Sequence, residues 1–161
     1  FVHSTSNAGN RLADVHGGLE GDTEMRLSDT YDLRAIDVLF LCSAHGESRK
    51  WMEANTVPAG VKVIDLAQDF RDESDGFVYG LPELNRDRIR TAQRVANPGC
   101  FATAIQLALL PLAAAGLLTG EVHVTAVTGS TGAGVKPSAT THFSWRSDNI
   151  SVYKALSLIH I

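Results

Sequence analysis

Two stretches of sequence decide the fold: IDVLFLCS at residues 36–43 and VKVIDL at residues 61–66. Both are short and nearly continuous in hydrophobicity, as strands buried on both faces of a parallel sheet are. Residues 45–54 between them suit a crossover helix, so the alternation predicts an α/β fold. Open parallel sheets bind ligands beyond the carboxyl ends of their strands, and we expect chemistry in the loops at residues 42–46 and 65–71.

Composition and charge narrow the function classes. The chain has 161 residues, of which 44% are hydrophobic, and a net charge of −4. These values predict a globular chain with a sizeable core and exclude a disordered one. The acidic balance, without a basic run, argues against nucleic acid or an anionic membrane as partner and favours a small-molecule substrate. Two widely spaced cysteines, Cys42 and Cys100, fit neither a disulfide scaffold nor a CxxC site and indicate a cytoplasmic protein.

The longest apolar run, at residues 101–118, approaches the length of about 20 residues that a membrane span needs. Four residues interrupt it: Thr103, Gln106, Pro111 and Gly116. No basic cluster or aromatic belt flanks it, so we expect a buried core helix and no membrane partner. Residues 122–127, which follow, read as a strand.

Cys100 is the strongest candidate for a chemical role. Asn97, Pro98 and Gly99 before it predict a sharp turn that brings the backbone close to a ligand and places Cys100 in the first turn of a helix. The unpaired N–H groups and the positive end of that helix stabilise a thiolate, which is the nucleophilic form. The alternative is a small residue packed at a helix start. For Cys42, inside an apolar strand, packing is the expectation.

Three other features indicate a functional site more weakly than Cys100 does. The glycine-rich loop GSTGAG, residues 129–134, offers backbone N–H groups as a phosphate cradle does, although an ordinary glycine turn has the same composition. Arg71 follows a strand's carboxyl end, where it can bind a phosphate or remain a solvated surface residue. His45 lies in a strand-end loop. The histidines lack metal-ligand spacing, and we predict no metal site.

These segments, in this order, resemble the N-acetyl-γ-glutamyl-phosphate reductase family, which is related to aspartate-semialdehyde dehydrogenase. The resemblance rests on six segments: STSNAG (4–9), SAHG (43–46), IDLAQDFR (64–71), YGLPELNR (79–86), NPGCFATA (97–104) and TGSTGAG (128–134). NPGC, with YGLPELNR upstream and the glycine loop downstream, is highly specific to that family. The similarity runs from about residue 1 to about residue 154.

The resemblance implies a partial NADP-binding Rossmann-type domain over residues 1–97 and the start of a second α/β domain, for catalysis and dimer contacts, over residues 98–155. It implies a homo-oligomeric whole protein that acts on an acyl phosphate in arginine biosynthesis. Cys100 is then the nucleophile that displaces phosphate to give a thioester, and hydride from NADPH reduces that thioester to N-acetylglutamate semialdehyde.

The resemblance also assigns the remaining site residues. Arg71 and Asn97 are expected on the substrate side, with Arg71 as a clamp for phosphate or carboxylate. The residues expected to bind NADP are Ser4, Thr5, Ser6, Arg11, Ser43, His45, Gly129, Ser130, Gly132 and Gly134. Among these, Arg11 is the expected contact of the 2′-phosphate.

Departures from the family pattern concern both ends of the chain. The family's opening strand and glycine-rich turn would precede residue 1, and its acid/base histidine would follow NISVYK, so we interpret the sequence as an inactive and poorly soluble fragment. LSLIHI at residues 156–161 is also the translation of a transposase end used in sequencing adapters. We therefore expect those residues to be non-native and His160 to be coincidental.

Three alternatives stay open. The chain can belong to a semialdehyde dehydrogenase that uses another acyl phosphate: aspartyl, N-succinyl-glutamyl or a lysine-pathway substrate. It can also be a non-catalytic dinucleotide-binding module. A cysteine hydrolase is the third possibility, and the absence of a clear Cys-His-Asn set argues against it.

Overall fold

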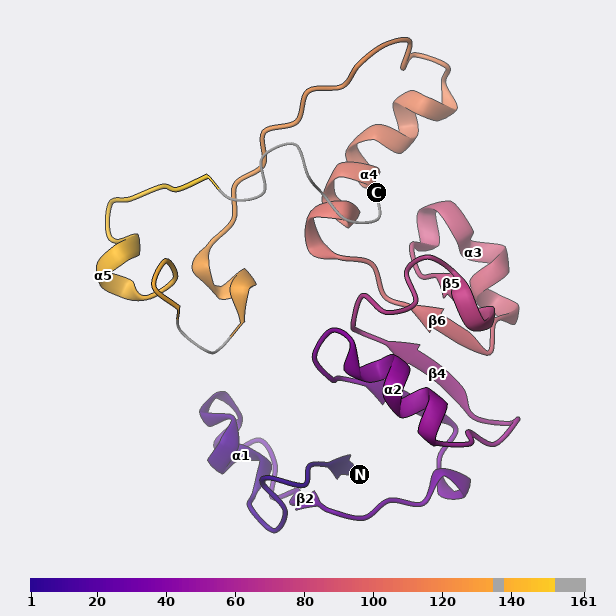
Figure 1. Ribbon diagram of the computed structural model, residues 1–161, viewed down its shortest axis with the longest axis vertical. Coiled ribbons are helices and arrows are strands. Elements are labelled where there is room, and N and C mark those ends of the chain that lie inside the picture. The colour runs from indigo at the N-terminus through magenta and orange to yellow at the C-terminus, as the bar shows by residue number, and fades with distance from the viewer. Residues whose placement is uncertain (135–137, 153–161) are drawn as a thin grey trace.

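The computed structural model describes residues 1–134 and 138–152, and its strands form two parallel sheets (Figure 1). The larger sheet has the order β3-β4-β6-β5, with bounds Val38–Leu41, Lys62–Asp65, Arg94–Ala96 and Val78–Tyr79 respectively. The smaller sheet pairs β1 (Val2–His3) with β2 (Leu27–Ser28). All four pairings within these sheets are parallel, which confirms the predicted α/β class and the two strands that decided it.

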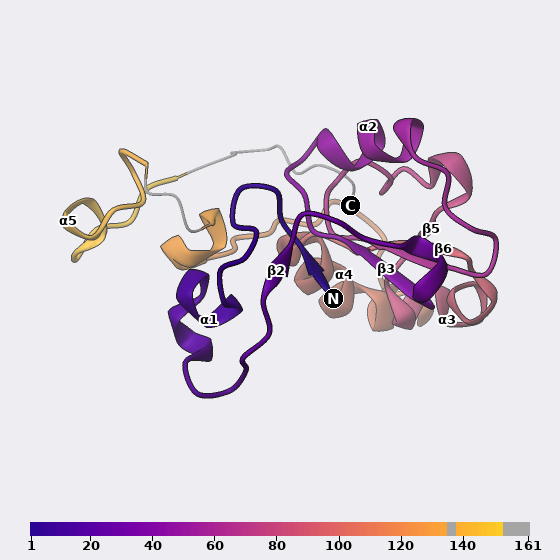
Figure 2. The ribbon, with the colours of Figure 1, turned by 90° about the horizontal axis from the view of Figure 1, so that it is seen from below.

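Helices cover both faces of the larger sheet. Figure 2 shows α2 (Glu47–Ala54) on one face, with α3 (Pro82–Thr91) and α4 (Cys100–Ala114) on the other. The crossover helix predicted between the first two strands of this sheet is therefore α2. The shorter helical segments are α1 (Leu12–Val15), α5 (Phe143–Arg146) and the 3-10 turns Gly17–Leu19, Leu33–Ala35, Ser74–Gly76 and Ser130–Ala133.

The strands of the larger sheet end at a common level. Leu41 pairs with Asp65, Asp65 with Ala96, and Ala96 with Tyr79. Because the strands are parallel, their following loops emerge side by side at one edge, which is where ligands of such sheets bind. The connections that begin there are residues 42–46, 66–71, 80–81 and 97–99.

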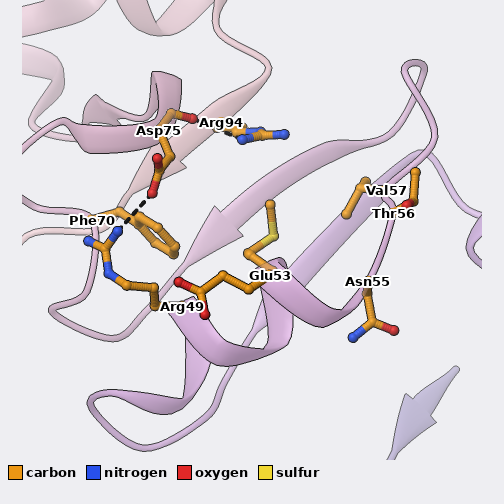
Figure 3. A pocket seen from close by; sticks show the side chains of 9 residues that line it. Arg49, Glu53, Asn55, Thr56, Val57, Phe70, Asp75 and Arg94 are labelled. Atoms are coloured by element: carbon orange, nitrogen blue, oxygen red, sulfur yellow. Dashed lines mark hydrogen bonds and ion pairs between the residues drawn. The ribbon is translucent and has the colours of Figure 1, made fainter.

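The core lies between α2 and the sheet. Phe70 and Phe77 are fully buried and stack with their ring centroids 4.1 Å apart, and the Arg49 guanidinium lies 4.6 Å from the Phe70 ring. Arg49 also bonds the Asp75 carboxylate at 2.7 Å, beside a cavity of about 470 Å³ that Figure 3 shows in close-up. Arg94, the first residue of β6, lines that cavity. The cavity therefore lies toward the amino ends of the strands, away from the site predicted at their carboxyl ends.

Two expectations for the second half of the chain are wrong. Residues 122–127 form no strand, since none of the described strands runs alongside them to complete a ladder, and Val127 is 80% exposed. The predicted buried core helix is present as α4, but Ala102 is its only buried residue, because the segment that follows extends away from it (Figure 1). Among the described residues, no helix combines the length and apolar character needed to cross a bilayer.

Candidate active site

Cys100 is the first residue of α4, as predicted from the Asn97-Pro98-Gly99 turn. Gly99 occupies the N-cap position with extended backbone, and its carbonyl oxygen accepts a hydrogen bond from the Thr103 amide at 2.8 Å. The Cys100 thiol is exposed and forms no disulfide. An exposed sulfur at the amino end of a fifteen-residue helix satisfies the positional requirement for a cysteine nucleophile.

Arg71 contacts this turn from the neighbouring loop. Its Nε donates to the carbonyl oxygen of Asn97 at 2.8 Å, and its Nη2 makes a longer contact of 3.4 Å with the carbonyl oxygen of Leu66. A Cβ atom on Gly99 would lie 3.1 Å from Arg71 Nη1, so glycine allows this close approach. The structure thus brings together the expected nucleophile, Cys100, and the two residues expected to bind the substrate, Arg71 and Asn97.

Asp69 connects the same loop to α2. Its two carboxylate oxygens accept hydrogen bonds from the Gly46 amide, at 2.7 Å, and the Arg49 amide, at 3.0 Å. Gly46 adopts a φ of +88°, which favours glycine there. The carboxylate therefore fills the amino end of α2, and that helix end cannot also receive a cofactor phosphate. Asp69 was not among the predicted site residues, although its place two residues before Arg71 is a usable signal.

The predicted cofactor residues Ser43 and His45 lie in the loop that Asp69 holds. His45 Nδ1 accepts a hydrogen bond from the Gln68 amide at 3.2 Å, and the Ser43 hydroxyl lies 2.8 Å from the hydroxyl of fully buried Ser48. A hollow of about 470 Å³ is lined by both loops and by α2. Two hydrogen bonds therefore hold the loops at residues 43–46 and 66–71 together: one from the Gly46 amide to Asp69, the other from the Gln68 amide to His45. These bonds connect the loop expected to bind the cofactor to the loop expected to bind the substrate.

Replacing Asp69 with asparagine should loosen the start of α2. One carboxylate oxygen becomes an NH₂ group that cannot accept from a backbone amide, so we expect a loss of about 1 kcal/mol, as for a lost helix cap. Hydrogen exchange of the Gly46 and Arg49 amides, measured on the whole protein, should become faster. Asp87→Asn is the matched control, because that carboxylate is 95% exposed and its ion pair with Arg90 is 4.0 Å long. Equal protection in the two variants would contradict the capping role.

Ser4, Thr5 and Ser6 follow β1 in an open loop. Within the described part of the chain, the backbone amides of Thr5, Ser6 and Asn7 donate to no acceptor. The loop closes at Gly9, which has a φ of +84° and accepts a hydrogen bond from Arg26 Nη1 at 2.7 Å on its carbonyl oxygen. Hydroxyls and free amides in one short loop can bind the ribose and phosphate groups of a nucleotide.

Arg11, the expected contact of the 2′-phosphate, is already surrounded by acids. Its guanidinium lies 2.8 Å from Asp14 and 3.4 Å from both Glu20 and Glu24. The hydrogen bond with Asp14, reinforced by the charges of the three carboxylates, raises the pKa of Arg11 further above its ordinary value. The guanidinium of Arg11 is therefore already engaged by carboxylates, whereas the nearby Arg26 acts on Asp14 through its charge alone.

The glycine loop is placed apart from the turn that bears Cys100. Ser130–Ala133 form a 3-10 turn, and Gly129, Gly132 and Gly134 are exposed. No described hydrogen bond or ion pair joins these residues to residues 97–100, so the role predicted for Gly129, Ser130, Gly132 and Gly134 stays a prediction.

Cys42 differs from Cys100 in its surroundings. Burial raises the pKa of the Cys42 thiol, and the nearby Asp65 carboxylate raises it further. Asp65 is fully buried; its Oδ1 accepts from the Ala67 amide at 3.1 Å, whereas Oδ2 has no partner in the described structure. A raised pKa disfavours the thiolate, which is the nucleophilic form. The packing role expected for Cys42 inside a strand is wrong, however, because Cys42 follows the last residue of β3 and is exposed.

Comparison with family models identifies both halves of the chain. Residues 1–92 match the semialdehyde dehydrogenase NAD-binding domain, and residues 100–161 match the semialdehyde dehydrogenase dimerisation domain. The chain belongs to the semialdehyde dehydrogenase family. The predicted domain boundary near Asn97 falls between the two matches, and the expected nicotinamide-dinucleotide domain is confirmed.

Comparison with individual proteins shows which members of the semialdehyde dehydrogenase family this chain is similar to. Curated proteins named N-acetyl-gamma-glutamyl-phosphate reductase, from Azobacteroides pseudotrichonymphae and Bacteroides thetaiotaomicron, are each 61% identical over the whole chain, which covers 51% of either protein. The chain thus spans about half the length of these curated relatives. The crystal structure of aspartate semialdehyde dehydrogenase II from Vibrio cholerae, complexed with ASA, superposes with a TM-score of 0.54 at 25% identity, covering 71% of this chain and 37% of that one. The resemblance to the reductase family is confirmed.

The dinucleotide implied by the family fits part of the described structure. The loop at residues 4–9 offers free amides and hydroxyls, and the loop at residues 43–46 lines an open hollow. The amino end of α2 does not fit a phosphate, because the Asp69 carboxylate fills it. The adapter-derived tail expected at residues 156–161, with His160, lies outside the described residues.

Proposed function

We propose that the whole protein containing this chain is an NADP-dependent N-acetyl-γ-glutamyl-phosphate reductase of arginine biosynthesis, located in the cytoplasm and assembled as a homo-oligomer. The observation that carries this proposal is the hydrogen bond of 2.8 Å from Arg71 Nε to Asn97, at the turn that starts α4 with Cys100. The names of the closely similar relatives support the substrate, and the dimerisation-domain match supports the oligomer.

In this proposal, Cys100 attacks the carbonyl carbon of the acyl phosphate. A C–S bond forms while the C–O bond to phosphate breaks, and inorganic phosphate leaves with the bonding pair. Arg71 lies beside this turn and stabilises the negative charge of the phosphate or of the substrate carboxylate. The nicotinamide cofactor, when bound, supplies the hydride that reduces the thioester to the aldehyde. In the last step the bond between carbon and the Cys100 sulfur breaks, which releases the aldehyde and frees Cys100 for the next turnover.

Arg26 is the residue that we propose for recognition of the 2′-phosphate, in place of Arg11. Its guanidinium donates to the carbonyl oxygen of Gly9 at the end of the loop after β1 and interacts with Asp14 through charge, but it forms no ion pair among the described residues, whereas Arg11 is held by three carboxylates. An arginine side chain accommodates the 2′-phosphate in Rossmann-type domains that use NADP. Arg26→Gln should raise KM for NADP⁺ at least about tenfold, the effect of one charge-assisted hydrogen bond.

Steady-state kinetics with NADP⁺ and NAD⁺ tests this assignment. KM for NAD⁺ should not change in Arg26→Gln, and Arg90→Gln, which removes the same charge from an exposed position of α3, is the control for net charge. A rise of KM for NADP⁺ in Arg11→Gln without one in Arg26→Gln would return the role to Arg11.

The proposed activity is tested in the reverse direction with the whole protein. Phosphate-dependent reduction of NADP⁺ by N-acetylglutamate semialdehyde is expected, at a kcat/KM well above that for N-succinylglutamate or aspartate semialdehyde. Preference for another semialdehyde would reassign the substrate. Product formation without nicotinamide reduction would indicate a hydrolase, and binding of NADP⁺ with no turnover of any semialdehyde would indicate a non-catalytic module.

A further inference from the structure

Tyr79 and Gly80 contact both chain segments that flank the turn bearing Cys100. The Gly80 amide donates to the carbonyl oxygen of Ala96 at 2.9 Å, at the end of the strand that enters the turn. The Tyr79 hydroxyl donates to Oε1 of Gln106 at 3.2 Å, on the helix that leaves it. Two adjacent residues therefore hold the backbone before the turn and the helix after it.

Tyr79 is itself held firmly. Only 8% of its surface is exposed, its amide donates to Glu73 Oε1 at 2.9 Å, and its carbonyl oxygen accepts from Asn85 Nδ2 at 2.9 Å. Glu73 also forms an ion pair with Arg88 at 2.9 Å, and the hydrogen bond from Arg88 lowers the pKa of the Glu73 carboxyl. The hydroxyl of Tyr79 thus projects from a backbone that is fixed on both sides.

The helix α4 has few other restraints in the described structure. Ala102 is its only buried residue, and Leu107 and Leu112 are 40% and 42% exposed. Gln106 lies six residues, or about 9 Å along the axis, beyond Cys100. A hydrogen bond at that distance from the helix start resists tilting of the axis, and a tilt would move the Cys100 sulfur relative to Arg71.

We infer that Tyr79 is a positioning residue of the active site, whose hydroxyl acts through Gln106 to hold Cys100 against the Arg71 side of the substrate. This inference rests on the proposed function. Since the hydrogen bond contacts neither substrate nor cofactor, its loss should lower kcat without changing binding. A displacement of reacting groups by a fraction of an ångström lowers rates strongly, and we expect a decrease of about tenfold.

Kinetics of five variants of the whole protein test the inference. Tyr79→Phe and Gln106→Leu each remove one partner of the hydrogen bond, and both should lower kcat about tenfold while KM for the semialdehyde stays within about twofold. The double variant should lose no more than either single one. Gln106→Glu keeps an acceptor oxygen and should retain the wild-type kcat. Tyr31→Phe, which removes a hydroxyl bonded to Asn55 at 3.3 Å, is the matched control and should behave as wild type.

The rate at which iodoacetamide alkylates Cys100 gives a second readout that needs no substrate. It should fall in Tyr79→Phe and Gln106→Leu and stay unchanged in Gln106→Glu. An unchanged kcat in both Tyr79→Phe and Gln106→Leu, or a loss of kcat in Gln106→Glu equal to that in Gln106→Leu, would overturn the inference. These outcomes differ from a failure of the proposed function, in which the wild-type protein itself would show no phosphate-dependent turnover.

Discussion

Replacing Cys100 with serine should abolish phosphate-dependent reduction of NADP⁺ in the whole protein, lowering kcat by more than about a thousandfold. The hydroxyl of serine is a far weaker nucleophile than a thiolate and forms an ester where the reaction needs a thioester. The exposed thiol at the start of α4 supports no packing, so the variant should fold and bind NADP⁺ as the wild type does. Stopped-flow or steady-state absorbance of NADPH measures the loss.

Cys42→Ser is the matched control for this substitution. Burial and Asp65 raise the pKa of the Cys42 thiol, which disfavours its thiolate, and kcat should stay within about threefold of wild type. Turnover that survives in Cys100→Ser, or that disappears only in Cys42→Ser, would contradict the assignment of Cys100.

Replacing Gly80 with alanine should destabilise the protein by about 2 kcal/mol. A Cβ atom there would lie 2.7 Å from Val95 Cγ1 and 2.9 Å from the carbonyl oxygen of Ala96, both inside van der Waals contact. The Ala96 oxygen belongs to the strand that leads into the catalytic turn, so the backbone itself must shift. Denaturant unfolding of the whole protein measures the change, and kcat should fall as well because the turn moves with β6.

Gly60→Ala provides the comparison. A Cβ atom on Gly60 meets no other atom within 4 Å, and we expect a change of less than about 0.5 kcal/mol. Equal stability of the two variants would show that the sheet relaxes around position 80 without cost, and that Gly80 does not fix β6.

The parts of the fold that local sequence determines were predictable. The runs at residues 36–43 and 61–66 became β3 and β4 as their continuous apolar residues predict. Burial on both faces was wrong for β3, because it is an edge strand of which Val38 and Phe40 are 40% and 58% exposed. The helix start at Cys100 followed from Pro98 and Gly99, which cannot continue the preceding strand. The proximity of Arg71 to the turn followed from topology, since parallel strands place their carboxyl ends at one edge.

The parts that depend on distant partners were not predictable. The bond from Tyr79 to Gln106 joins residues 27 apart, and the cap of Asp69 on α2 joins residues 20 or more apart, so no local pattern signals either. The strand expected at residues 122–127 failed for the same reason, because strand propensity without a ladder partner leaves extended chain. Of the three carboxylates around Arg11, Asp14 is a local partner three residues away, whereas Glu20 and Glu24 come from later parts of the chain.

Intact-protein mass spectrometry tests the central claim most directly. The whole protein is mixed with N-acetyl-γ-glutamyl phosphate in the absence of NADPH, and the adduct is mapped by peptide digestion at acidic pH, where thioesters persist. We predict one N-acetylglutamyl group on Cys100, with release of one phosphate for each adduct, and its disappearance when NADPH is added. Release of phosphate without an adduct on Cys100, or an adduct on another residue that NADPH removes, would contradict the account.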